Sequence, residues 1–115
     1  MQSLQPDSQR TPLNGVTAVT ILTAPAVGFT NTAVALRLPN GDTAPVTAIL
    51  YKDIGGTAIE IARKEGLAVN ETWDDAVTLL KRLVLKPTES LKMALSGAPA
   101  TNQPVALVDF LVGTD

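Results

Sequence analysis

The residue types that most often perform chemistry in proteins are scarce in this sequence. It contains no histidine and no cysteine. Without histidine, the chain lacks the commonest general base, the commonest zinc ligand and the middle member of a Ser-His-Asp triad. Without cysteine, it forms neither disulfides nor thiolate metal sites. The sequence therefore predicts a protein that is not an enzyme and that needs no cofactor.

Two motifs have a formal claim to catalysis or nucleotide binding. Ser90 and Lys92 are two residues apart, so a strand would place them on one face, where a lysine can activate a hydroxyl. A solvated lysine is the plainer interpretation of this spacing. Gly55-Gly56 invites comparison with a phosphate loop, but no Gly-Lys-Ser/Thr follows it. We therefore assign no catalytic or nucleotide site to either motif.

The densest acidic cluster is formed by Glu71, Asp74 and Asp75. Calcium accepts carboxylate oxygens at such a spacing, although a calcium loop normally supplies more ligands and a glycine. Glycoside hydrolysis requires two carboxylates that face each other across a cleft, whereas adjacent residues in a turn point apart. A solvated turn is the default interpretation, and no metal site is predicted.

Charge and aromatic content narrow the classes of partner. The net charge is −2 and the sequence pI is about 5.0, so the chain lacks the basic field that attracts nucleic acid. The four aromatic residues are too few for a stacking platform unless they cluster; they are Phe29, Tyr51, Trp73 and Phe110. Trp73 is predicted to anchor the core or an interface, with exposed sugar stacking as the alternative.

The stretch from Leu13 to Leu36 contains no charged residue. Pro25, Gly28 and several threonines interrupt it, so no membrane span is predicted. The first residues also lack the basic and apolar regions of a signal peptide. We expect a soluble protein that is made without export.

Apolar residues alternate along most of the chain, which is the period of a half-buried strand. Val34, Leu36 and Leu38 alternate with smaller or polar residues, Pro39-Asn40-Gly41-Asp42 then signals a reverse turn, and alternation resumes at Val46. This pattern predicts a β-hairpin. Further strands are expected in residues 16–24, 57–62, 90–95 and 105–112, and a charged turn is expected at residues 63–66.

Residues 67–85 are ambiguous. Helical spacing of apolar residues favours a short helix near residues 73–82, whereas the surrounding pattern favours strands with a turn at Asp74-Asp75. In total the sequence predicts seven or eight short strands in an all-β, antiparallel β-sandwich, either a jelly roll or an Ig-like fold. Residues 13–115 are expected to form one domain. Residues 1–12 are expected to form a flexible N-terminal arm, or one that orders on a neighbouring subunit.

Charge is distributed unevenly along the chain. Residues 1–51 contain four charged residues, whereas residues 52–92 contain fourteen. Because interface cores are depleted of charge, the first strand is one candidate for a protein interface; an ordinary buried strand pair explains the pattern equally well. The candidate interface residues are Val16, Thr17, Ala18, Val19, Thr20, Ile21, Leu22 and Thr23, together with Trp73.

The order of several turn and strand elements resembles that of the small β-sandwich virion proteins of tailed bacteriophages. The resemblance covers residues 22–112 and departs in two places: residues 73–82 are longer than expected, and Thr88-Glu89 replaces the usual glycine of the last corner. The matching positions are Gly55, Gly56, Thr57, Ile61, Ala62, Glu71, Leu83, Val84, Leu85, Pro87, Ser90 and Leu91.

This resemblance implies a non-enzymatic structural protein in the head, neck or tail of a virion. The implied roles are capsid decoration, neck or collar protein, and tail accessory protein. The implied partners are further copies of the chain and other virion proteins such as capsid, portal or tail subunits, with neither nucleic acid nor membrane. A carbohydrate-binding or adhesin module for host attachment is the alternative function.

Overall fold

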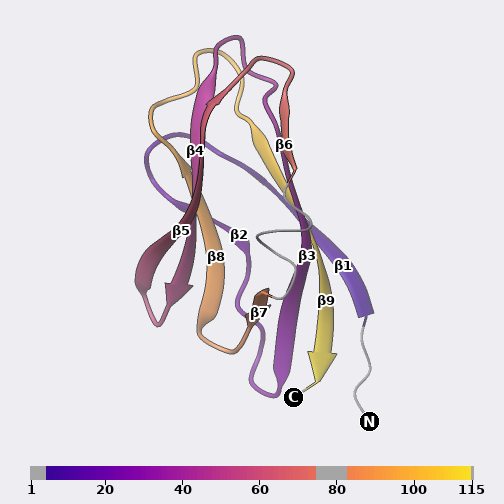
Figure 1. The fold of residues 1–115 in the computed structure, drawn as a ribbon. Helices are drawn as coiled ribbons and strands as arrows, with labels where there is room; N and C mark the ends of the chain where they lie inside the picture. Colours follow the sequence, from indigo (N-terminus) through magenta and orange to yellow (C-terminus); the bar gives the residue numbers. More distant parts are fainter. Residues whose placement is uncertain (1–4, 75–82, 115) are drawn as a thin grey trace.

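The computed structural model describes residues 5–74 and 83–114, and in these residues it contains nine strands and no helix. Two sheets pack face to face in a body about 47 Å long (Figure 1). The strands are β1 (Gln5–Pro12), β2 (Val19–Leu22), β3 (Phe29–Pro39), β4 (Val46–Ile54), β5 (Thr57–Leu67), β6 (Thr72–Asp74), β7 (Leu83–Leu85), β8 (Glu89–Leu95) and β9 (Val105–Thr114).

Each sheet is built from strands that are distant in sequence. The five-stranded sheet has the order β1-β9-β3-β6, and β7 also pairs with β3. The four-stranded sheet has the order β2-β8-β4-β5. All of the pairs are antiparallel. β6 and β7 lie along the same edge of β3 and run in the same direction, so they form two parts of one interrupted strand.

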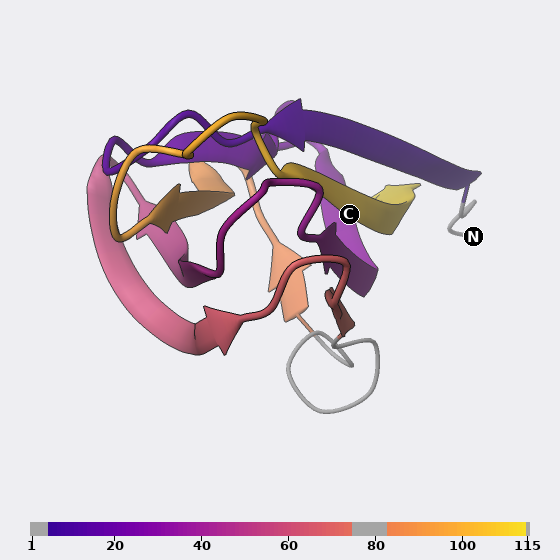
Figure 2. The same cartoon turned by 90° about the horizontal axis from the view of Figure 1, so that it is seen from above.

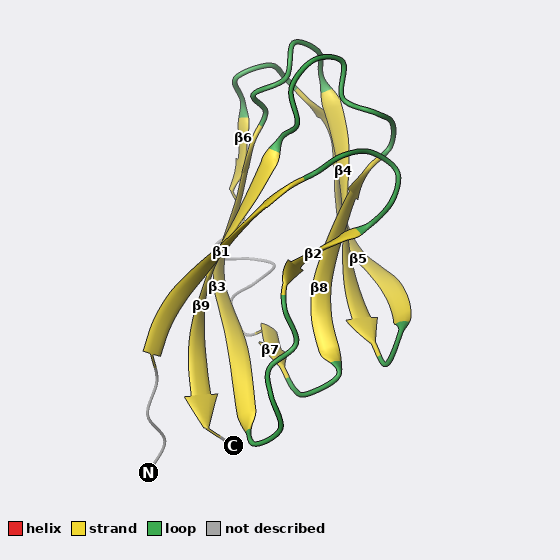
Figure 3. Ribbon diagram, turned by 180° about the vertical axis from the view of Figure 1, so that it is seen from behind, coloured by secondary structure: helices red, strands yellow, loops and turns green. Residues whose placement is uncertain are grey.

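The topology is that of a rolled hairpin. β4 pairs with β5, β3 with β6 and β7, β2 with β8, and β1 with β9, so the chain folds as one long antiparallel ribbon whose tip is the β4–β5 turn. Successive pairs of the ribbon alternate between the two sheets (Figures 2 and 3). This arrangement is a jelly roll. The prediction of an all-β antiparallel sandwich is confirmed, and of its two variants the structure has the jelly roll.

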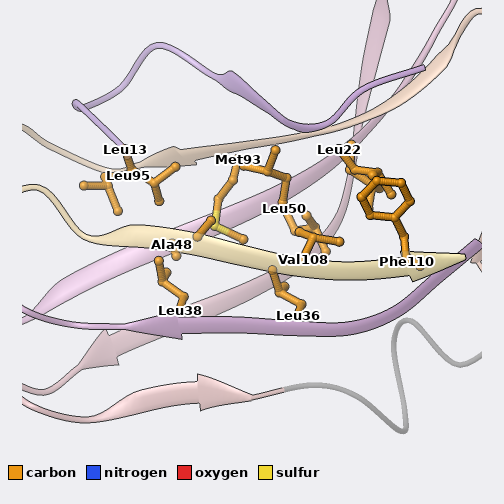
Figure 4. Packing of buried hydrophobic residues seen from close by; sticks show 14 of the residues in the cluster. Leu13, Leu22, Leu36, Leu38, Ala48, Leu50, Met93, Leu95, Val108 and Phe110 are labelled. Atoms are coloured by element: carbon orange, nitrogen blue, oxygen red, sulfur yellow. The ribbon is translucent and has the colours of Figure 1, made fainter. Parts of the chain in front are cut away.

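The core is an aliphatic layer between the sheets. Leu36 and Val108 from the five-stranded sheet and Leu50 and Met93 from the four-stranded sheet are fully buried or nearly so. Figure 4 shows these side chains gathered in one cluster with Phe110. Burial of one such side chain stabilises the fold by about 1.5–3 kcal/mol. Among the described residues, no helix has the length and apolarity that crossing a membrane requires.

The expected hairpin at residues 39–42 is wrong. β3 and β4 lie in different sheets, so the connection between them crosses the sandwich instead of reversing within one sheet. The side chains of Asn40 and Asp42 are buried and bind backbone groups of two other loops. The tight hairpin is the β4–β5 connection, where Gly55 and Gly56 both have positive φ (61° and 95°) as a two-residue turn requires.

Strand alternation breaks within β3. The register shifts between Ala33 and Ala35, so two residues oppose one on β9, which is a β-bulge. Leu36 and Leu38 therefore face the core, whereas Val34, which the simple alternation grouped with them, is 38% exposed.

Three segments differ from the sequence expectation or fall outside the structure's description. Residues 5–12, expected as an arm, form β1 and pair with β9 over their whole length, because backbone hydrogen bonds replace the apolar pattern that they lack. Residues 63–66, expected as a charged turn, continue β5, whose free edge accepts charged side chains. Residues 75–82, the main part of the possible helix, lie outside the described residues.

Candidate functional site

The expected serine–lysine pair is engaged elsewhere. Lys92 Nζ lies 3.2 Å from Asp53 Oδ2, and the other oxygen of Asp53 accepts the Gly56 N–H at 2.9 Å. The lysine therefore pairs with a largely buried carboxylate next to the β4–β5 turn. This arrangement fixes the strand pair and leaves Ser90 without an activated lysine.

The acidic cluster does not come together as a metal site in the part of the chain that the structure describes. Glu71 Oε1 accepts the Ala68 N–H at 3.0 Å and so closes its own loop. Asp74 lies on β6 opposite Arg37 of β3. Asp75 lies outside the described residues.

The residues predicted as a strand interface divide between core and surface. Ile21 and Leu22 are fully buried in the core of this chain, and Val19 packs against that core. Both faces of the strand turn inward here because a register shift between Thr20 and Leu22 adds a residue. In residues 16–23, only Val16, Thr17 and Thr23 remain exposed, while Ala18 and Thr20 are half-buried. The structure therefore does not present this strand as one open face.

Trp73 faces the interior. It pairs with the fully buried Leu38 and packs against the core cluster, half-buried. Phe110 is also buried, whereas Tyr51 and Phe29 lie on other strands, β4 and the start of β3. The four aromatic residues of the chain therefore form no shared stacking surface.

Asp42 organises the upper end of the sandwich. Its Oδ1 accepts the N–H groups of Asn102 (3.0 Å), Thr101 (2.8 Å) and Thr43 (2.8 Å), and its Oδ2 accepts that of Ala100 (2.8 Å). The Asn102 N–H contributes most, and these bonds together outweigh desolvation and lower the pKa of Asp42 to about 2. The sequence hints at this role only through the Asn-Gly-Asp turn.

Asn40 extends the same junction to a third loop. Its side-chain N–H groups donate to the carbonyls of Leu67 (2.9 Å) and Ala44 (3.0 Å), and its Oδ1 accepts the Asp42 N–H (3.0 Å). The β3–β4, β5–β6 and β8–β9 loops are thereby tied together by two buried side chains. All the donors and acceptors involved are satisfied, so we interpret this junction as structural.

The outer face of the five-stranded sheet is the most distinctive surface of the molecule. Cross-strand register places its outward side chains in rows, which we call the outer face. The rows, from the lower end of Figure 1 upward, are Pro6–Leu111–Thr32–Val84 (the apolar row), Ser8–Asp109–Ala35 (the middle row), Arg10–Leu107–Arg37–Asp74 (the charged row) and Pro12–Val105.

The apolar row carries no charge, and shallow hollows flank it. Val84 is 40% exposed, and Val34, displaced outward by the bulge, is 38% exposed. Val34, Leu111 and Pro6 line one shallow hollow of this face. Arg37 Nη2 of the charged row lies 3.7 Å from Asp109 Oδ2 of the middle row, and both side chains are about half exposed.

The opposite face of the sandwich is different in character. The outward side of the four-stranded sheet carries two ion pairs, Lys92 with Asp53 (3.2 Å) and Arg63 with Glu60 (2.9 Å). The Arg63 hydrogen bond lowers the pKa of Glu60, and the same contact raises the pKa of Arg63. The outer face also carries four charged side chains, so the charge asymmetry of the sequence does not separate the two sheets; the uncharged part of the outer face is its apolar row.

The free edge of β1 is closed to strand addition. Pro6 and Pro12 lack an N–H, and the Ser8 N–H donates to the carboxylate of Asp7 at 2.8 Å. Pro6, Ser8, Arg10 and Pro12 occupy alternate positions, so their backbone nitrogens share the side of β1 away from β9, and three of these four positions offer no free N–H. Prolines at such positions protect an edge strand from pairing with another chain. Contacts made by the five-stranded sheet are therefore directed to its face.

Comparison with known proteins identifies a shared fold. No protein-family model matches the sequence, and no curated protein matches it. Among solved structures, the chain is similar to one titled "Acidic stable capsid structure of Helicobacter pylori bacteriophage KHP30", with a TM-score of 0.56 and 12% identity over 100% of this chain and 94% of that chain.

Two further structures share the fold. One is titled "Cyanophage Pam1 capsid asymmetric unit", with a TM-score of 0.50 and 14% identity over 98% of this chain and 85% of that one. The other is titled "Bacillus endospore appendages form a novel family of disulfide-linked pili", with a TM-score of 0.54 and 9% identity over 99% and 89%. At such low identity the likeness shows the fold alone: this chain has a β-fold that also occurs in phage capsids and in a bacterial pilus.

Proposed function

We propose that this protein is a non-enzymatic structural component of a tailed-phage virion, which acts by protein–protein assembly as a capsid decoration, neck or collar, or tail accessory protein. The observation that carries the proposal is that the jelly roll takes up nearly all of both this chain and the similar chain of the bacteriophage KHP30 capsid structure. A chain that is almost wholly scaffold acts through its surfaces. The protein would be made in the host cytoplasm and reside in the virion.

Two features of the surface support an assembly role. The outer face joins an uncharged apolar row to the middle and charged rows, whose four charges sum to zero, which is the composition of an interface with an apolar part and a polar rim. The protected edge of β1 limits uncontrolled strand pairing, which a protein stored at high local concentration in a particle must avoid.

The other functions receive less support. The pilus in the comparison is described as disulfide-linked, and these 115 residues contain no cysteine. The alternative of a carbohydrate-binding or adhesin module calls for an exposed aromatic platform. Trp73 instead faces the interior, and the remaining aromatic residues lie apart from it.

The test is whether the protein is part of purified particles. Phage particles released by bacteria that carry the gene for this chain would be banded on a density gradient. Peptides of this protein would then be quantified by mass spectrometry against the major capsid subunit. We expect a fixed ratio to that subunit in every particle fraction. A second measurement would add recombinant protein to particles that lack it, and we expect it to co-sediment with them.

A host cytoplasmic protein of similar abundance is the control for carry-over. Presence of the chain in the lysate, combined with its loss from washed particles in parallel with that control, would contradict the proposal. Specific binding to a host glycan together with absence from the particle would favour the adhesin alternative.

A further inference from the structure

The charge pattern of the outer face is self-complementary. We propose that a second copy of this chain packs on the outer face, face to face, about a two-fold axis that runs along the strands between β9 and β3. The proposal rests on the proposed function in that it uses the same assembly surface, and it names the occupant of that surface. The argument uses only the cross-strand register and the charges of the described residues.

A two-fold axis in this position reverses the order of the strands in the second copy relative to the first. It does not move a residue along the strand direction, so each row of one copy faces the same row of the other. β1 of one copy therefore faces β6 and β7 of the other, and β9 faces β3. Such an interface is isologous, so every residue contact occurs twice. The order β1-β9-β3-β6 makes this exchange possible, because two strands lie on each side of the axis.

Opposite charges meet under this operation. Arg10 and Asp74 stand at the two ends of the charged row, on β1 and β6, so Arg10 of one copy faces Asp74 of the other. Arg37 on β3 faces Leu107 of the other copy and Asp109 on β9 faces Ala35, so these two charges keep their pairing within each copy. The four charges of these two rows sum to zero, and none of them is placed directly opposite a like charge.

The apolar row also meets itself. Pro6 of one copy faces Val84 of the other, and Leu111 faces Thr32. Facing sheets cross at about 30°, and the outer strands lie only about 7 Å from the axis at a strand spacing of about 4.8 Å. The crossing therefore shifts a residue on an outer strand by a few ångström from the residue that it faces, and an arginine side chain can span that shift.

A two-fold axis that runs across the strands fails the same test. With the axis at the middle row, Asp109 faces its own copy and the apolar row faces the charged row. With the axis at the charged row, Arg10, Arg37 and Asp74 each face an identical charge. Like charges that are directly opposed across an interface oppose association, so the pattern favours the axis along the strands over these two placements.

The area of the outer face sets the expected affinity of the dimer. Four strands about 4.8 Å apart and seven residues of about 3.4 Å rise give a face of roughly 450 Å² on each copy. Specific interfaces bury about 800 Å² on each partner. We therefore expect a weak dimer with a dissociation constant in the micromolar range, which many copies in one particle would strengthen by avidity.

The experiment is a charge-reversal cycle on the intact chain. Arg10 and Asp74 are separated by three strand spacings within one copy, about 14 Å, so they interact only across a dimer. Arg10→Glu, Asp74→Lys and the double variant would be compared by sedimentation equilibrium from about 1 to 500 μM, a range that brackets a micromolar dissociation constant. Both side chains are exposed, and circular dichroism and a thermal melt verify that each variant folds.

The expected result is a concentration-dependent rise from 12.0 kDa to twice that mass for the unmodified protein. Each single variant places two like-charge pairs in the interface and weakens the dimer by about tenfold or more. The double variant restores opposite charges and recovers most of the affinity. The matched controls are Lys64→Glu and Glu65→Lys, which make the same charge changes on β5 of the other sheet, and they leave the dimer unchanged.

A protein that remains monomeric at 500 μM overturns the proposal, as does a dimer whose affinity the cycle leaves unchanged. A double variant no tighter than the singles points to a different axis and also overturns it. The particle-composition experiment above is independent of this result, because a monomer can still be found in virions and a dimer can be absent from them.

Discussion

The Asp42 carboxylate and the Asn102 N–H lie 3.0 Å apart although 60 residues separate them in sequence. This hydrogen bond joins the crossing between the two sheets to the long β8–β9 loop. It belongs to a set of four backbone N–H groups around one buried side chain, and the first prediction follows from that set.

Replacement of Asp42 by Asn will destabilise the protein in a pH-dependent way. Because folding lowers the pKa of Asp42 to about 2 from an ordinary value near 3.8, its contribution to stability is fully present above about pH 4 and is lost as the pH falls toward 2. We expect the urea midpoint of D42N to lie well below that of the unmodified protein at pH 7. The two midpoints should converge between pH 4 and pH 2.

Glu65→Gln is the control for this comparison, because Glu65 is exposed on β5. Its midpoint should follow that of the unmodified protein at every pH. A constant difference between D42N and the unmodified protein from pH 7 to pH 2 would show that the carboxylate charge is not the source of the stabilisation.

Replacement of Thr88 by Gly will stabilise the protein. Lys86 to Glu89 form a turn closed by the Glu89 N–H to Lys86 carbonyl bond (2.9 Å), and Thr88 has φ 74°. A β-branched residue is disfavoured there by about 1–2 kcal/mol, of which the greater flexibility of glycine in the unfolded chain offsets part. We expect a net gain of about 0.5–1 kcal/mol in chemical denaturation.

Thr88→Ala is the matched variant, because it keeps the Cβ that causes the strain. Thr88 is exposed, so neither substitution removes core packing. If Ala and Gly stabilise equally, backbone strain is not the cause.

Truncation of a leucine that faces the core will lower the free energy of unfolding more than truncation of a leucine on the outer face. Leu50 is fully buried between the sheets, and Leu50→Ala should cost about 3–5 kcal/mol in the free energy of unfolding. Leu107 lies on the outer face and is half-buried, so Leu107→Ala should cost about 1 kcal/mol or less. Equal costs, measured by urea unfolding, would contradict the assignment of inner and outer faces.

Restoration of the missing donors on β1 will promote association through the sheet edge. Pro6→Val and Pro12→Val together add two N–H groups to the free edge, and Asp7→Ala releases the Ser8 N–H. We expect the triple variant to form slowly growing, thioflavin-positive oligomers, because an unprotected edge strand templates pairing. Light scattering over days measures the growth.

Pro25→Val, which changes a proline in the loop between β2 and β3, is the control and should not aggregate. A triple variant that stays unassociated would show that the prolines and Asp7 do not guard this edge.

The sequence predicted the fold class because alternation and turn chemistry are local signals. The alternation of β8 and β9 appears in the structure at the expected positions. Pairing between distant strands is not local, and that is where prediction failed. The Asn40-Gly41-Asp42 segment has the composition of a hairpin turn, yet its two polar side chains are satisfied by loops far away in sequence.

The outer face was hidden from sequence analysis for a related reason. Its rows combine residues such as Pro6, Thr32 and Val84 that are distant in sequence and individually unremarkable in type. The charge-poor stretch did indicate that uncharged surface exists, but it selected β2, where a bulge turns Ile21 and Leu22 into the core. Bulges shift the inside–outside alternation by one residue and leave no clear mark in composition.

Gln5 pairs with Val112, so the two described ends of the chain are neighbours at the lower end of the sandwich, away from the Asp42 junction (Figure 1). A cargo polypeptide fused to either end would emerge from that same pole. A short linker could also join the two ends, with new termini opened elsewhere, and leave every strand pair of the rolled ribbon in place. The molecule is thus suited to one-sided display.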